Sequence, residues 1–331
     1  MINWGIVGLG NMAWNFANSI KETQNAKLVS IASLEKKRLE NFKKELDIET
    51  KNCFNNYEDL IKSEEIDAIY ISTLNNKHLD IIIKCSENKK NILCEKPITL
   101  NLEQAELALK YVLKNKVIFF EAIAYKAHPQ INEVRNLITQ NLIGEITDIK
   151  TSFGFKVEKI KPKSRLFNPD FGGGSLLDLG CYPISFLEIF EKTDGNMQFI
   201  STKGGFAKTG VDDFAEAIVK LNNNINCEIK VSFKENLDNK TIIKGTKGKI
   251  IIYNPWLPNK KDYIEIFDGK SLYKKFINSN LSVYANQINR VSEAFKNGIY
   301  ENEFLIDIKK SYKIMKNLTL WKKLIIKNNN G

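Results

Sequence analysis

The sequence predicts an α/β protein in two parts: an N-terminal domain with a doubly wound parallel sheet, and a C-terminal α+β domain with a largely antiparallel open sheet. In the first third of the chain, continuous apolar runs alternate with amphipathic segments. This pattern is typical of parallel strands that helices cover on both faces. After about residue 125, apolar and polar residues alternate along longer runs, which favours antiparallel strands with one covered face. We therefore expect domains at 1–124 and 125–331.

In the first part, apolar runs predict strands and the amphipathic segments between them predict helices. The segment 35–46 shows the helical pattern well, because Leu39, Phe42 and Leu46 fall on one face. The predicted strands are 3–7, 27–33, 68–72, 91–94 and 117–120, and the predicted helices are 12–22, 35–46, 57–62, 78–87 and 102–114.

In the second part, alternating strands surround a loop rich in lysine, proline and glycine. The predicted strands are 146–156, 198–206, 215–221, 227–233, 240–244 and 249–253, and the predicted helices are 129–140, 175–190, 283–296 and 304–326.

Composition narrows the function classes. The 331 residues are 43% hydrophobic and 27% charged, as expected for a globular protein of about two domains. No run approaches the ~20 apolar residues that span a bilayer, and the N-terminus shows no secretory signal, so we expect no membrane partner and a cytoplasmic protein. The five cysteines form no paired motif and only two histidines are present, which argues against a metal site.

The net charge of +10 raises the question of nucleic acid. The basic residues are mostly lysines spread along the chain, so we predict no nucleic-acid partner. A mild attraction for anionic substrates such as nucleotide sugars fits this distribution better.

A glycine turn follows the first predicted strand and opens a helix. Gly8, Gly10 and Ala13 have the spacing and context of a Rossmann dinucleotide-binding fingerprint. Gly8 permits a tight turn, Gly10 lets the backbone approach a pyrophosphate, and Ala13 allows close packing. The helix start, with Asn11 and Met12, attracts negative charge. The alternative is a turn that only packs a helix on a sheet.

The end of the second strand bears on which nicotinamide cofactor binds. An acidic residue usually ends this strand in NAD-binding domains, whereas here it ends at Ser33. Arg38 follows at the start of the next helix, and a hydroxyl with basic residues suits the 2′-phosphate of NADP. We predict NADP over NAD, the alternative being a solvated helix start.

Glu95, Lys96 and Pro97 directly follow the strand 91–94 and so lie at the carboxyl edge of the parallel sheet, where such sheets bind ligands. Pro97 favours an extended Lys96. A lysine held there can polarise a substrate oxygen, although by spacing alone a lysine at a strand end is usually just solvated.

These motifs together resemble the glucose-fructose oxidoreductase / inositol dehydrogenase / MocA family, in the branch that holds dimeric dihydrodiol dehydrogenase and sugar oxidoreductases. The resemblance spans residues 1 to about 190, and beyond that it rests on strand order. The matching segments are the glycine turn, Glu95-Lys96-Pro97, residues 121–130 (E-A-x-x-Y-R-x-H-P in the family), Arg165-Leu166-Phe167 and residues 172–183 (G-G-G-x-L-x-D-x-G-x-Y).

The resemblance implies roles for matching residues. Lys96 is the implied active-site lysine, and Tyr182 the proton donor or acceptor where many relatives carry histidine. Asp178, four residues earlier on a predicted helix, would bind a substrate hydroxyl. A nearby Lys96 ammonium would lower the pKa of Tyr182 from about 10. Further substrate contacts are expected from Tyr125, Lys126 and Arg165, and further cofactor contacts from Thr73, Asn75, His78, Glu95 and Lys96.

Two departures from the family pattern affect these expectations. Lys126 replaces the usual arginine, so a bidentate contact is lost. Leu74 replaces a proline, which affects the loop before His78; this histidine either caps its helix or lies near the nicotinamide. His128 is expected to be a structural helix-entry residue rather than a catalyst.

The implied function is an NAD(P)-dependent oxidoreductase that transfers hydride between nicotinamide and a sugar, nucleotide sugar or related polyol or ketone. The alternatives are a non-catalytic cofactor-binding regulator, and a glycosidase or cyclase that uses transient redox of a bound cofactor. In this family the open sheet commonly builds oligomers, so a homodimer or homotetramer is expected. The loops at 156–171 and 254–261 carry no code that identifies the substrate.

Overall fold

The computed structural model describes residues 1–191, 197–222 and 224–330, and the chain divides into two compact units. One unit holds Met1–Ala127 and Leu281–Lys313; the other holds His128–Asn280 and Ile314–Gly331. The segment Leu281–Lys313 differs from the predicted division, because it packs on the N-terminal sheet. Its Ser292 Oγ accepts the indole N–H of Trp4 at 3.0 Å. The assignment of 1–124 to cofactor binding and of 125–331 to substrate binding and oligomerisation stays a prediction.

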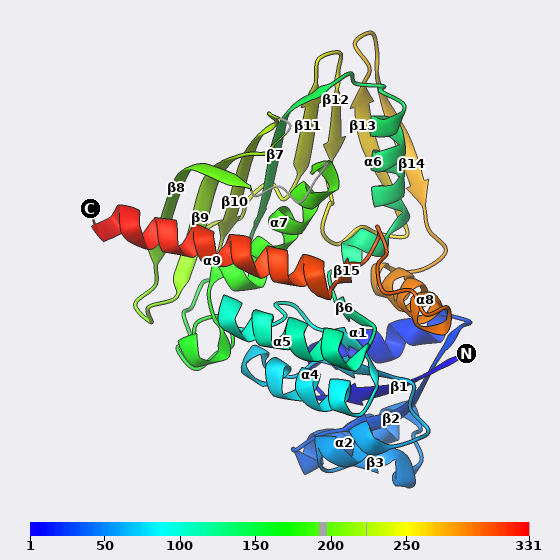
Figure 1. The fold of residues 1–331 in the computed structure, drawn as a ribbon. Coiled ribbons are helices and arrows are strands. Elements are labelled where there is room, and N and C mark those ends of the chain that lie inside the picture. Colours follow the sequence, from blue (N-terminus) through cyan, green and yellow to red (C-terminus); the bar gives the residue numbers. More distant parts are fainter. Residues whose placement is uncertain (192–196, 223, 331) are drawn as a thin grey trace. The chain divides into compact units, whose positions relative to one another are not determined.

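The first unit contains a seven-stranded sheet in the order β15-β6-β5-β4-β1-β2-β3, parallel except for β15 (Figure 1). The strand order reverses between β4 and β1, and such a switch point is where open parallel sheets bind ligands. The strands are β1 (Ile2–Val7), β2 (Ala26–Ala32), β3 (Cys53–Phe54), β4 (Ala68–Ile71), β5 (Asn91–Cys94), β6 (Phe119–Glu121) and β15 (Ile306–Asp307).

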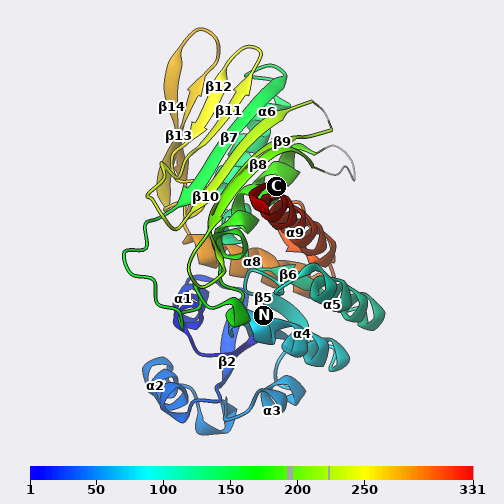
Figure 2. The ribbon, with the colours of Figure 1, turned by 90° about the vertical axis from the view of Figure 1, so that its left-hand side faces the viewer.

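Helices cover both faces of this sheet, with α1 on one side and α4 and α5 on the other (Figure 2). On the α1 face, Trp4 is fully buried and its ring centroid lies 5.2 Å from that of Phe16 and 5.5 Å from that of Phe295. The helices are α1 (Asn11–Ser19), α2 (Lys36–Leu46), α3 (Tyr57–Lys62), α4 (His78–Glu87), α5 (Leu102–Asn115) and α8 (Val283–Lys296), with short 3₁₀ turns η1 (Ile20–Glu22), η2 (Thr50–Asn52), η3 (Asn75–Lys77) and η4 (Ala124–Ala127). These elements confirm the predicted doubly wound parallel domain.

The second unit contains an eight-stranded sheet in the order β14-β13-β12-β11-β7-β10-β9-β8. All neighbours are antiparallel except β7 and β10, which confirms the predicted largely antiparallel sheet. The strands are β7 (Ile146–Gly154), β8 (Gln198–Phe206), β9 (Asp212–Lys220), β10 (Asn226–Ser232), β11 (Thr241–Gly245), β12 (Lys249–Ile252), β13 (Lys261–Phe267) and β14 (Leu272–Asn278).

The helical segments depart from the prediction at 175–190, and the predicted helix 304–326 begins only at Ile308, after the short strand β15. The predicted helix 175–190 is a π-helical turn (η6, Leu176–Gly180), then α7 (Cys181–Leu187) and a 3₁₀ turn (η7, Glu188–Phe190). The remaining helices are α6 (Pro129–Thr139) and α9 (Ile308–Asn330), and a 3₁₀ turn, η5 (Pro169–Phe171), precedes η6. α9 contributes its first residues to the first unit and its remainder to the second.

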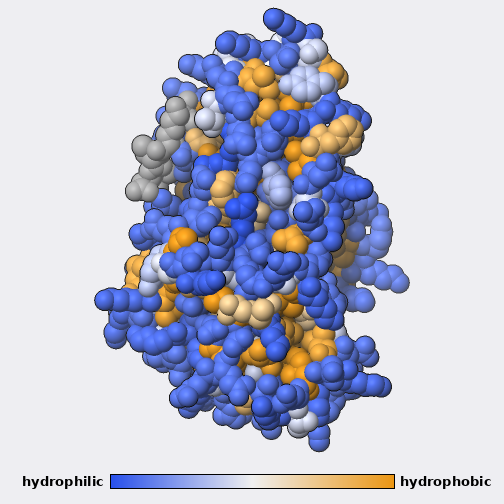
Figure 3. Space-filling view, turned by 90° about the vertical axis from the view of Figure 1, so that its right-hand side faces the viewer, coloured by the Kyte–Doolittle hydropathy of each residue, from blue (hydrophilic) through white to orange (hydrophobic). Residues whose placement is uncertain are grey.

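Side chains of the second sheet alternate between its two faces. Ile250, Ile252 and Ile264 are buried on the face against which α7 packs. The opposite face carries Ile218 and Tyr253, both more than two-fifths exposed. Viewed from another side, apolar side chains form separate small groups among hydrophilic ones (Figure 3).

Candidate functional site

The glycine turn connects β1 to α1 and is held by both neighbouring strands. Gly8 has φ of 90°, and a Cβ there would lie 2.6 Å from Thr73 Cγ2 and 2.9 Å from Thr73 N, so only glycine fits. The Gly8 N–H donates to Ala32 O at 3.0 Å, and Ser72 Oγ donates to Gly8 O at 2.7 Å. The turn is therefore fixed at the carboxyl ends of β2 and β4.

The start of α1 is suited to an anion. Gly10 caps the helix without any side-chain hydrogen bond, and no acidic residue lies in the first turn. A Cβ on Gly10 would meet only Ser72 O, at 4.0 Å, so the space beside the backbone is open. Asn11 and Met12 present their backbone there, while Ala13 is fully buried against the sheet. These residues fit the pyrophosphate of a dinucleotide.

Arg38 reaches from α2 back to this turn. Its Nη1 lies 3.5 Å from Leu9 O, and its Nε lies 2.8 Å from Glu35 Oε2. Ser33 is buried, and its Oγ accepts the Glu35 N–H at 3.1 Å. The structure thus brings the Arg38 guanidinium beside the glycine turn, while the Ser33 hydroxyl accepts the Glu35 N–H.

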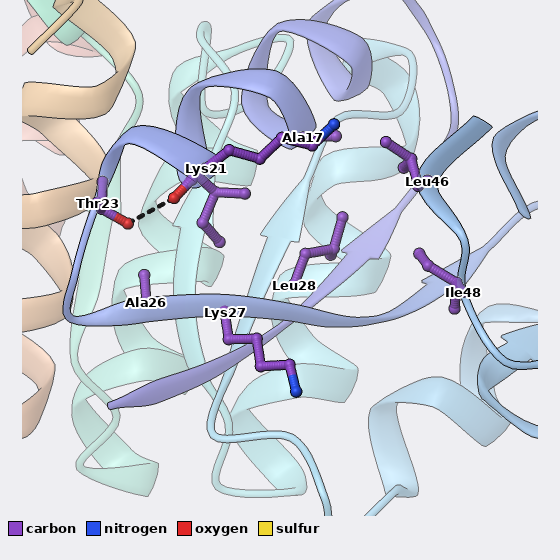
Figure 4. A pocket seen from close by; sticks show the side chains of 9 residues that line it. Ala17, Lys21, Thr23, Ala26, Lys27, Leu28, Leu46 and Ile48 are labelled. Carbon is purple, nitrogen blue, oxygen red and sulfur yellow. Dashed lines mark hydrogen bonds between the residues drawn. The ribbon is translucent and has the colours of Figure 1, made fainter.

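A shallow pocket at the other end of β2 is unrelated to this site. It is lined by side chains from the end of α1, the start of β2 and the end of α2, including Ala17, Ala26 and Leu46 (Figure 4). Thr23 Oγ1 donates to Ile20 O at 2.7 Å beside it. Because this is the amino end of β2, the pocket lies away from the glycine turn.

Lys96 lies in a turn at the carboxyl end of β5, and the Lys96–Pro97 peptide bond is cis. Lys96 is half-buried, whereas Glu95 is buried and its Oε1 accepts the hydroxyl of Tyr70 at 2.5 Å. In the sheet order, β5 lies next to β4, which is adjacent to β1 and its glycine turn. The structure therefore brings Lys96 to the edge where the cofactor turn lies.

His78 joins two loops at this edge. Its Nδ1 lies 2.9 Å from Pro97 O and its Nε2 lies 3.3 Å from Thr73 O. The side chain has 0% exposure; burial lowers the pKa of His78, and its hydrogen bonds to backbone groups oppose this. The buried ring thus lies between the Thr73 loop and the Lys96 turn, and its contact with the cofactor stays a prediction. Asn75, half-buried in η3, belongs to the same loop.

One aromatic neighbour of Lys96 was not predicted. Tyr284 lies half-buried in the first turn of α8. Burial and the nearby Glu95 carboxylate raise the pKa of Tyr284, while the Lys96 ammonium lowers it. No local sequence signal marks this tyrosine, since only the packing of α8 against the first sheet brings it here.

In the second unit, Asp178 lies in the π-helical turn η6, a feature frequent at functional sites. Asp178 is buried, and its Oδ1 lies 2.8 Å from Arg165 Nη1, whose side chain is 57% exposed. Tyr182 follows in the first turn of α7. Its ring packs edge-on against Phe153 at 5.0 Å and against Trp256 at 5.8 Å between centroids. The aromatic contacts fix the ring of Tyr182.

Asp212, at the start of β9, anchors the segment that carries Asp178. Its Oδ2 accepts the Ser175 hydroxyl at 2.9 Å and the Leu176 N–H at 2.6 Å. A Cβ on Gly174, where φ is 122°, would lie 2.5 Å from Asp212 Oδ1. The Asp212 carboxylate therefore occupies the space that a side chain at position 174 would need. Sequence reasoning missed Asp212 because the contact is long-range.

Two predicted substrate residues are almost inaccessible. Tyr125 is 0% and Lys126 is 3% exposed, both in η4. His128 accepts the Gln130 N–H at the start of α6, as a helix-entry residue would. Among the described residues, no cluster of histidine, cysteine and acidic side chains is arranged to hold a metal ion. In the same part of the chain, no helix has the length and apolar character needed to cross a membrane.

Comparison with known proteins identifies the family. Residues 2–123 match the family model described as the oxidoreductase family with an NAD-binding Rossmann fold, and residues 131–251 match the GFO/IDH/MocA C-terminal domain. Trans-1,2-dihydrobenzene-1,2-diol dehydrogenase of Xenopus tropicalis is 31% identical over 258 residues, covering 77% of this chain and 76% of that protein. The chain belongs to the GFO/IDH/MocA oxidoreductase family.

Further comparisons extend the similarity over nearly the whole chain. The mouse (Mus musculus) trans-1,2-dihydrobenzene-1,2-diol dehydrogenase is 27% identical over 310 residues, covering 91% of this chain and 90% of that protein. The 3-ketoreductase KijD10 from Actinomadura kijaniata, solved with NADP and TDP-benzene, superposes with a TM-score of 0.86 at 20% identity, covering 98% and 97% of the two chains. Aldose-aldose oxidoreductase from Caulobacter crescentus superposes with a TM-score of 0.89 at 17% identity, covering 99% and 98%.

Family membership confirms the predicted resemblance, the two-part fold, the class of NAD(P)-dependent dehydrogenase or reductase, and a nicotinamide dinucleotide as cofactor. The roles of individual side chains stay predictions.

Proposed function

We propose that this member of the family is an NADP-dependent oxidoreductase of a sugar, nucleotide sugar or related polyol or ketone, with Lys96 and Tyr182 as its active-site pair. The observation that carries the proposal is the position of Lys96, at the carboxyl edge of β5 beside the anion-binding glycine turn. The relatives act on compatible compounds by name: dihydrodiols, a 3-keto substrate and aldoses.

Each side chain has a defined task in this proposal. The nicotinamide supplies the hydride acceptor or donor when bound. In the oxidative direction, Tyr182 takes the proton that the substrate hydroxyl loses, and in the reductive direction it returns that proton to the carbonyl oxygen. The Lys96 ammonium stabilises negative charge on that oxygen and lowers the pKa of a phenol beside it. Asp178, oriented by Arg165, accepts a hydrogen bond from a second substrate hydroxyl.

A substrate panel tests the reaction. Sugars, nucleotide sugars and dihydrodiols, with their keto forms, are assayed by NADPH absorbance, with NADH in parallel. We expect stoichiometric net conversion of NADPH with at least one of these carbonyl compounds. Cofactor binding without turnover on any compound would favour a regulator. Substrate conversion without net NADPH change would favour a glycosidase or cyclase that re-reduces its own substrate.

The preference for NADP is tested at Arg38. Replacing Arg38 with alanine is expected to raise the KM for NADPH about 10- to 100-fold, because a charge-assisted contact to the 2′-phosphate is lost. The KM for NADH should change little. The exposed Glu35–Arg38 pair stabilises the fold by at most about 1 kcal/mol, so the variant should fold. Lys44→Ala, at the exposed end of the same helix, is the charge-matched control. Equal effects of Arg38→Ala on both cofactors would rule out this selectivity.

We further propose that the outward face of the second sheet forms a homodimer or homotetramer. Ile242 and Ile251 lie opposite each other on this face, and Tyr263 lies opposite Phe276, which is 69% exposed. Exposed apolar side chains on neighbouring strands favour a partner surface. Light scattering should give the mass of two or four chains, and Phe276→Lys should lower it; a monomeric wild type would contradict the proposal.

A further inference from the structure

A second buried carboxyl lies directly behind the Lys96 turn. Glu121 ends β6, where it pairs with Cys94 of β5 on one side and Ile306 of β15 on the other. Its side chain is only 2% exposed. Neither the proposed reaction nor the sequence motifs give this side chain a task.

Glu121 holds the backbone that follows Lys96. Its Oε1 accepts the N–H of Ile98 at 2.9 Å. One residue earlier, the Pro97 carbonyl lies 2.9 Å from Nδ1 of His78. Two buried side chains from different elements thus fix the two backbone groups that come directly after Lys96.

The second oxygen of Glu121, Oε2, is buried. The Ser311 hydroxyl is the side-chain group that faces this carboxyl. Burial raises the pKa of Glu121 to about 7, and the nearby Glu95 carboxylate raises it further. The Ser311 hydroxyl, the Ile98 N–H and the Lys96 ammonium each lower this pKa. The Cys94 thiol also faces this carboxyl. Burial also lowers the pKa of His78, the other side chain that contacts this turn.

We propose that Glu121 is a positioning residue for Lys96, which fixes the turn through Ile98 and, by gaining or losing its proton, changes the charge that Lys96 faces. The ionised carboxylate holds the ammonium form of Lys96 more firmly than the neutral acid does. Activity that depends on Lys96 therefore follows the protonation of Glu121. This inference rests on the proposed role of Lys96.

The pH profile of kcat/KM tests whether the protonation of Glu121 changes the activity that depends on Lys96. Glu121→Gln keeps an oxygen to accept the Ile98 N–H but cannot ionise. We expect the wild type to show an ionisation near pH 7 that Glu121→Gln lacks. Asp307→Asn is the matched control, since Asp307 is a buried acid on β15 that accepts the N–H groups of Lys309 and Lys310 instead. Its profile should keep the ionisation. Identical wild-type and Glu121→Gln profiles would overturn the proposal.

Thermal unfolding provides a second readout that needs no substrate. Glu121 has a higher pKa in the folded protein, about 7, than its ordinary value of 4.5, so the folded state binds the proton more tightly. Its contribution to stability is present at low pH and is lost as pH rises through about 7. As the pH rises from 4.5 to about 7, the melting temperature of the wild type should therefore fall relative to that of Glu121→Gln. Parallel curves would also overturn the proposal.

Lys96→Met separates this inference from the proposed function. If Lys96→Met keeps wild-type turnover, the proposed function fails. If Lys96→Met is inactive while Glu121→Gln leaves the pH profile unchanged, only the role of Glu121 fails.

Discussion

Replacement of Lys96 with methionine is expected to lower kcat for net substrate turnover by about 10²- to 10⁴-fold. Methionine keeps an unbranched chain of similar volume but removes the ammonium that we propose to face the reacting oxygen. Lys96 is half-buried in a turn that His78 and Glu121 hold through Pro97 and Ile98, so the fold should survive the change. The variant loses stabilisation of the transition state, because negative charge develops on the substrate oxygen only in the transition state.

The measurement is kcat from NADPH absorbance, with the Kd for NADPH from fluorescence. We expect this Kd to change by less than about tenfold, since the pyrophosphate is assigned to the glycine turn and not to Lys96. Lys84→Met, exposed on α4, is the control for loss of one lysine from the same unit. A kcat for Lys96→Met close to that of Lys84→Met would remove Lys96 from the chemistry.

Local patterns predicted most of the first sheet. β1, β4 and β5 are continuous apolar runs, and each is buried almost throughout. β3 and β15 are two residues long and carry no readable period, so they were not predicted. β14 was missed for another reason: nearly all of its side chains are exposed, so apolar and polar residues do not alternate along it.

The residues of the candidate site also fall into those that local sequence patterns predicted and those that they did not. The glycine turn and the Lys96 turn were predictable, because the requirement for glycine at position 8 and the strand before Lys96 are local. Tyr284 and Asp212 were not, since each acts on a residue far away in the sequence. His78 was noticed in the sequence, yet only its buried contacts show that it ties two loops. Local sequence patterns thus indicate the proposed reacting groups, whereas the side chains that contact them come together only through tertiary packing.

Tyr182→Phe is expected to lower kcat by about 10²- to 10⁴-fold, because the variant keeps the ring and loses the proton donor and acceptor. Phenylalanine preserves the edge-on packing on Phe153 and Trp256, so stability should change little. Tyr273→Phe, on β14, removes an equivalent hydroxyl from an exposed position of the same unit and should be nearly neutral. A near-normal kcat for Tyr182→Phe would assign the proton to another group.

A double-mutant cycle decides whether Tyr182 and Lys96 act as one unit. If the ammonium works partly by lowering the pKa of the phenol, then Lys96→Met removes part of what Tyr182→Phe removes. The double variant should then be much less impaired than the product of the two single losses predicts. Multiplicative losses would mean that the two groups act independently on the substrate. In that case Tyr284, whose pKa responds to Lys96 within the first unit, becomes the phenol to test beside this lysine.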